Sequence, residues 1–157
     1  VNGYAMGGGF ELAMSCDMIV AGEGAQFGLP ETQRGLFAAA SGAFRLARLI
    51  PRPIANEVLT TGLRLDAARA LALGVVNRVV AADAVLDTAV ALAGKVTESA
   101  PLAVTASLDL ARKTYDLDEA GLWELNRKHA AVVMSSADAI EGATAFIEKR
   151  APNWTGK

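Results

Sequence analysis

The sequence contains few of the residues on which several classes of site depend. Among its 157 residues Cys16 is the only cysteine and His129 the only histidine. A single cysteine excludes an internal disulfide and favours a reducing compartment, so we expect a cytoplasmic protein. We expect no metal site.

Long apolar runs and concentrated positive charge are also missing. No uncharged apolar stretch of the roughly 18 residues needed for a transmembrane helix occurs, so no membrane association is expected. The formal net charge is −2, and Lys and Arg are spread singly along the chain, which argues against nucleic acid as a partner. A hydrophobic content of 52% with 20% charged residues is typical of a globular domain with a core.

Glycine, proline and capping residues divide the chain into short elements. Strands are expected at 1–5, 17–21, 25–28 and 75–80. Helices are expected at 9–15, 38–49, 54–61 and 67–73, and then in sequence at 83–98, 101–113, from 118 and 138–150. Asp66, Asp83, Asp118 and Asp138 are expected to start helices, with Gly74 in a left-handed C′ conformation. This order predicts an α/β core over residues 1–80 and a helical region over residues 81–157.

The stretch VNGYAMGGGFELAMSCD places three glycines where a helix begins. The first N–H groups of a helix have no intrahelical partner, so bare backbone there can receive a phosphate, a pyrophosphate or a carbonyl oxygen becoming an enolate. The phosphate-loop lysine and the GxGxxG spacing are both missing. Two interpretations remain equally open on spacing alone: an oxyanion hole using the N–H of Gly8, or a tight helix–strand crossing.

Two glutamates follow the glycines. Glu11 falls in the first turn of an apolar helix, and Glu31 follows a strand end and a proline in GLPETQRGL. A buried carboxylate without a partner is costly, which makes Glu11 a candidate catalytic group. Each also has a plain structural interpretation, Glu11 as a first-turn acid and Glu31 as an exposed loop acid.

These motifs have a counterpart in a known family. VNGYAMGGGFELAMSCDMIVAGEGAQFGLPE resembles the signature region of the crotonase, or enoyl-CoA hydratase/isomerase, superfamily, and LTTGLRLDAARALALGVVNRVV and EGATAFIEKRAPNW resemble its later segments. The resemblance implies a spiral of ββα turns followed by a helical region used for trimer assembly. It also implies an acyl-CoA thioester substrate whose carbonyl oxygen is held by two backbone N–H groups, one of them matching Gly8. The other belongs to a segment before Val1, so we expect the chain to be the C-terminal part of a longer enzyme.

The same resemblance assigns roles to the glutamates. Glu11 is expected to activate water and Glu31 to transfer a proton at C2, and retention of both favours syn hydration of a trans-2-enoyl-CoA. A Δ3-Δ2-enoyl-CoA isomerase, or another reaction of CoA thioesters, is the alternative enzyme, and a non-catalytic oligomerisation module is the alternative of another class. Gly7 and Ala39 are expected near the substrate, where alanines at 38–40 replace a proline–glycine turn and alter acyl preference.

The helical region supplies the remaining expectations. Phe146 and Lys149 match positions near the nucleotide of CoA, although a buried Phe and a solvated Lys explain that segment as well. No cofactor is expected beyond the CoA of the substrate, and the expected assembly is a homotrimer or hexamer. His129, Trp123 and Trp154 are interpreted as surface, packing or subunit-contact residues, and Cys16 as a small core residue.

Overall fold

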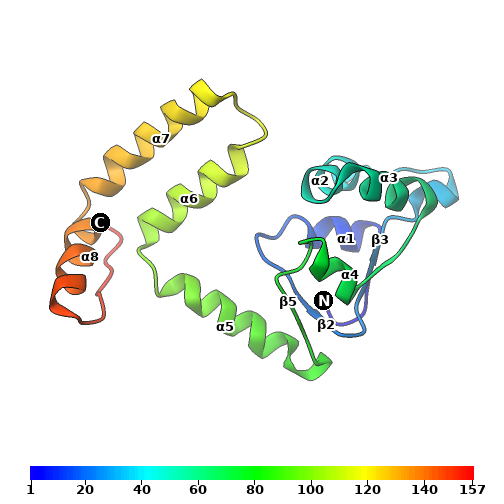
Figure 1. Cartoon of the computed structure of the whole chain (residues 1–157), viewed down its shortest axis with the longest axis horizontal. Helices are drawn as coiled ribbons and strands as arrows, with labels where there is room; N and C mark the ends of the chain where they lie inside the picture. The colour runs from blue at the N-terminus through cyan, green and yellow to red at the C-terminus, as the bar shows by residue number, and fades with distance from the viewer. The chain divides into compact units, whose positions relative to one another are not determined.

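A computed structural model describes the whole chain, residues 1–157. It forms two compact units, Val1–Ala91 and Leu92–Lys157, coloured blue to green and green to red in Figure 1. The division falls inside the helix α5 (Val85–Thr97). The catalytic and assembly roles expected for the two parts stay predictions.

Two small sheets organise the first unit. Strands β1 (Tyr4–Met6), β3 (Gln26–Gly28) and β4 (Leu65–Asp66) form one sheet in the order β1-β3-β4. β1 runs parallel to β3, with Ala5 opposite Phe27, and β4 is antiparallel to β3. Strands β2 (Val20–Gly22) and β5 (Arg78–Val80) pair in parallel as the second sheet. Parallel neighbours need crossover connections, and helices of the same unit lie within them.

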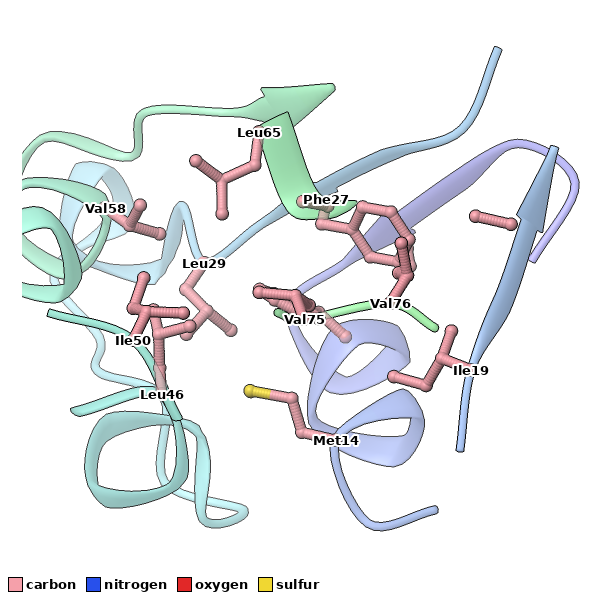
Figure 2. Close-up of a cluster of buried hydrophobic side chains, with 14 of the residues drawn as sticks. Met14, Ile19, Phe27, Leu29, Leu46, Ile50, Val58, Leu65, Val75 and Val76 are labelled. Atoms are coloured by element: carbon pink, nitrogen blue, oxygen red, sulfur yellow. The ribbon is translucent and has the colours of Figure 1, made fainter. Parts of the chain in front are cut away.

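The helices of this unit are short. They are α1 (Gly8–Ala13), the 3-10 helix η1 (Glu31–Arg34), α2 (Gly42–Leu49), α3 (Arg52–Thr61), α4 (Ala67–Ala72) and the 3-10 helix η2 (Ala82–Ala84). Figure 2 shows side chains from α2, α3, β3 and β4 turned towards one another in the core. The rings of Phe10 and Phe27 are fully buried, with centroids 5.3 Å apart, so α1 is fixed against the sheet.

The second unit contains α6 (Pro101–Lys113), α7 (Glu119–Met134) and α8 (Ala137–Glu148). α6 and α7 lie side by side (Figure 1), joined by a 2.8 Å contact between His129 Nε2 and Asp109 Oδ2. No helix by itself has the length and apolar character to cross a membrane; α7 and α8 meet that criterion only as a pair bent by 65°.

The C-terminal segment folds back onto α8. Asp138 is buried and accepts hydrogen bonds from the N–H and hydroxyl of Thr155 and from the N–H of Gly156, at 2.7, 3.0 and 2.9 Å. These bonds hold the pKa of Asp138 below its usual value, the N–H of Thr155 being the largest cause. The indole N–H of Trp154 donates to the carbonyl of Glu98 at 2.8 Å.

Several predicted helix boundaries and caps are confirmed. α6 spans Pro101–Lys113 as predicted. Asp66 caps α4 by accepting from the N–H of Arg69 at 2.7 Å, and Asp118 caps α7 by accepting from Gly121 at 2.8 Å. Gly74 has the predicted left-handed conformation, with φ of 79°.

Other predictions are wrong, each for a visible reason. Asp83 lies within η2 rather than capping a helix. α8 begins at Ala137, so Ser136 is its cap, and Asp138 lies in the first turn, where it binds the C-terminal segment. Cys16 is exposed, because it lies in the exposed segment 15–18 between α1 and β2. The helix predicted from Ala38 begins only at Gly42, because Ser41 adopts a left-handed φ of 89°.

Candidate active site

Gly7 forms the turn from β1 into α1. Its φ and ψ of 55° and −128° are a conformation that side chains disfavour. Its N–H donates to the carbonyl of Gly28 at 2.9 Å, and its own carbonyl accepts from the N–H groups of Phe10 and Glu11. The N–H of Gly8 therefore lies in the exposed first turn of α1, where no intrahelical acceptor exists.

Glu11 has a specific partner that the sequence did not indicate. Its side chain is 6% exposed, and Oε1 accepts the N–H of Gly42 at 2.8 Å. Gly42 is the first residue of α2, so the carboxylate lies at the N-terminal end of that helix, where the helix dipole is positive. A Cβ at Gly42 would lie 2.8 Å from both Glu11 Oε1 and the Cβ of Ala38. Glycine at position 42 is thus required by the close approach of the carboxylate.

Glu31, which comes later in the sequence, also lies close to this turn. It is the first residue of η1, and its Oε1 lies 3.0 Å from the position that a Cβ of Gly7 would occupy. Its second oxygen, Oε2, is buried and has no hydrogen-bond partner. Buried polar atoms nearly always have a partner, so an unpaired carboxylate oxygen points to a functional role.

The short helix η1 is tied to the end of α3. The hydroxyl of Thr32 donates to the carbonyl of Leu59 at 3.1 Å, and the amide of Gln33 donates to the carbonyl of Thr61 at 2.7 Å. The last carbonyls of a helix lack intrahelical donors, so both bonds satisfy groups that α3 leaves free. These two side chains hold the helix that carries Glu31, and no sequence motif marked them beyond their place next to it.

A cavity of about 460 Å³ opens beside Glu31. Its wall contains Met6, Gly7, Pro30, Glu31, Gln33, Arg34, Leu36, Gly62 and Arg64. Gly7 and Glu31 therefore face one space, whereas Gly8 and Glu11 are not part of its wall. The structure brings Gly7, Gly8, Glu11 and Glu31 together around the first turn of α1, with the carboxylate of Glu11 packed against Gly42 rather than in the cavity.

The other predicted site residues lie elsewhere. Ala39 is exposed in the turn that precedes α2. Phe146, on α8, is 86% exposed rather than buried, and Lys149 ends that helix in a left-handed conformation with φ of 56°. These two belong to the second unit, and their expected contact with CoA stays a prediction.

Comparison with known proteins decides the family. The profile of the family described as enoyl-CoA hydratase/isomerase matches residues 1–157. The chain belongs to the enoyl-CoA hydratase/isomerase family. The resemblance read from the glycine–glutamate motif is thereby confirmed, and so is the crotonase fold, by the structural relatives below.

Curated and structural relatives of this family match the whole chain. Carnitinyl-CoA dehydratases of Proteus mirabilis and Citrobacter koseri are 45% and 47% identical over 161 residues, which is 100% of this chain and 62% of each relative. The crystal structure of an enoyl-CoA hydratase from Mycobacterium tuberculosis is 43% identical with a TM-score of 0.95, covering 99% of this chain and 62% of that one. An enoyl-CoA hydratase from Mycobacterium marinum is 44% identical with a TM-score of 0.95, covering 99% and 64%. The chain thus spans less than two thirds of the length of these relatives.

Proposed function

We propose that this chain carries the catalytic glutamates of an enoyl-CoA hydratase, which adds water to the double bond of a trans-2-enoyl-CoA. The observation that supports this most directly is the buried, unpaired Oε2 of Glu31 beside a cavity that also contains Gly7. A carboxylate oxygen without a protein partner is available to a water molecule or a substrate proton.

In the proposed reaction the backbone stabilises negative charge, and the two carboxyl groups transfer protons. The N–H of Gly8 donates to the thioester carbonyl oxygen and stabilises the negative charge that develops there when C3 is attacked. Glu11, as a carboxylate, takes one proton from the water while the water oxygen bonds to C3, and Glu31 in its protonated form is the acid for the next step. Glu31 delivers a proton to C2, so the enolate collapses to the 3-hydroxyacyl-CoA and the elements of water are added across the bond.

A second candidate reaction is dehydration of carnitinyl-CoA, which the names of the two curated relatives favour. Removal of water from a 3-hydroxyacyl thioester uses the same groups in reverse, so the two candidates differ in substrate rather than in machinery. Isomerisation of a Δ3 double bond is the third candidate and needs only proton transfer. We further propose an acyl-CoA partner, a homotrimer or hexamer, and a cytoplasmic location.

Product analysis in isotopically labelled water separates these reactions. The longest polypeptide that contains this sequence should convert crotonyl-CoA to 3-hydroxybutyryl-CoA with solvent oxygen at C3. Deuterium without new oxygen would indicate an isomerase, and turnover of carnitinyl-CoA alone would indicate the dehydratase. A folded oligomer that binds no CoA thioester would favour the non-catalytic assembly module and contradict the proposal.

A further inference from the structure

Two arginines stand in the cavity wall next to Glu31. Arg34 ends η1, three residues after Glu31, and Arg64 follows Gly62 just before β4. Both are exposed. The cavity wall therefore contains two positive charges and one negative charge, with a net excess of one positive charge.

Neither guanidinium has an anionic partner within the chain. Arg34 Nη1 reaches only the carbonyl of Pro30, at 3.4 Å, and the guanidinium carbon of Arg64 lies 5.8 Å from the ring centroid of Tyr4. The salt bridges of the protein involve other residues. An arginine fork has five N–H donors arranged to match a carboxylate, and here most of these donors are free.

We propose that Arg34 and Arg64 bind a carboxylate on the acyl part of the substrate, so that the preferred substrate is an enoyl-CoA with a second, free carboxyl group. This inference rests on the proposed function, because it places the acyl group in the cavity beside Glu31. The acyl part is favoured over the phosphates of CoA because Glu31 works at C2, whereas the pantetheine arm separates the phosphates from the thioester.

The same charges disfavour the substrate named for the curated relatives. The acyl group of carnitinyl-CoA bears a quaternary ammonium, and such cations are recognised by aromatic faces. No aromatic residue is part of the cavity wall, and the two arginines would repel the cation. The positive excess therefore points to an anionic acyl group.

Binding of saturated thioesters tests this without turnover. The dissociation constants of adipyl-CoA and hexanoyl-CoA, which differ in a terminal carboxylate, are measured by calorimetry on the longest polypeptide containing the sequence. We expect adipyl-CoA to bind about tenfold or more tightly, as charge-assisted bidentate hydrogen bonds do. Arg34→Gln and Arg64→Gln should each reduce that ratio, whereas Arg78→Gln, at an exposed position of β5 outside the cavity wall, should preserve it.

A second pair of ligands separates binding of the acyl carboxylate from binding of the CoA phosphates. The pantetheine thioesters of adipic and hexanoic acid lack the nucleotide, and the same ratio is expected for them. If Arg34→Gln and Arg64→Gln weaken binding of the CoA thioesters but not of the pantetheine thioesters, the two arginines bind phosphate and the proposal is overturned. Equal affinity of the unmodified protein for adipyl-CoA and hexanoyl-CoA would also overturn it. Adipyl-CoA preference without hydration of any enoyl-CoA would overturn the proposed function alone.

Discussion

The position of Glu11 depends on one glycine 31 residues away in sequence. The backbone N–H of Gly42 replaces the water that the carboxylate loses on burial, and the start of α2 adds partial positive charge. A carboxylate fixed by this hydrogen bond holds one orientation. This arrangement explains how an apolar helix tolerates a buried acid.

Replacing Gly42 by alanine tests this residue contact. Its Cβ would lie 2.8 Å from Glu11 Oε1, so the carboxylate or α2 must move, and we expect a loss of about 1–3 kcal/mol in the free energy of unfolding. The measurement is chemical denaturation. Gly94→Ala is the matched control, because nothing lies within 4 Å of its Cβ in α5, and it should stabilise by about 0.5–1 kcal/mol. Equal stability of Gly42→Ala and the unmodified protein would contradict the close contact.

At the scale of elements, hydrogen bonds join η1 to the end of α3 and so hold Glu31 in place. Gln33→Ala removes the bond to the carbonyl of Thr61, an exposed interaction worth about 0.5–1.5 kcal/mol of stability. The larger expected effect is on hydration, because Glu31 would lose its fixed position. Gly62→Ala should act in the same direction, since its Cβ would lie 2.7 Å from Gln33 Nε2. Reduced stability with unchanged kcat per folded molecule would show that the tie is structural only.

The fold-back of the C-terminal segment predicts a pH dependence of the second unit. Hydrogen bonds from Arg150, and then from the N–H of Asn153, lower the pKa of Glu141 from 4.5 to about 2. A depressed carboxyl pKa stabilises the fold above the unfolded value, so this contribution is lost as pH falls from about 4.5 towards 2.

Fluorescence of Trp154 in a Trp123→Phe background reports this segment. Unfolding curves between neutral pH and pH of about 2 should show declining stability, and Glu141→Gln should remove part of that decline. Glu57→Gln, at an exposed position of α3, is the control and should retain it. An identical pH dependence for Glu141→Gln and the unmodified protein would contradict the account.

Across the whole molecule, the sequence correctly predicted those helix starts, helix caps and turns that depend only on neighbouring residues. Pro101 fixed the start of α6, and the carboxylates of Asp66 and Asp118 capped the helices that follow them, because each acts within three residues. The motif of glycines and glutamates also located the region of the site, since the turn at Gly7 requires a positive φ whatever packs around it.

Long-range packing decided the features that the sequence did not reveal. Asp138 looks like a cap but is used by Thr155 and Gly156, 17 and 18 residues later. The pairing of Glu11 with Gly42 and the meeting of Arg34 with Arg64 in one cavity depend on the fold, which no local pattern encodes. Turn geometry at Ser41 likewise overrode a run of good helix formers.

The central claim is that Glu31 handles the proton in hydration, and its most direct measurement is kcat for crotonyl-CoA hydration by Glu31→Gln. The amide keeps the shape of the side chain but cannot exchange the proton, so we predict a fall of about 10²–10⁴-fold with unchanged thermal stability. Glu23→Gln, in the exposed turn after β2, is the matched control and should keep full activity. Turnover by Glu31→Gln equal to that of the unmodified protein would contradict the account.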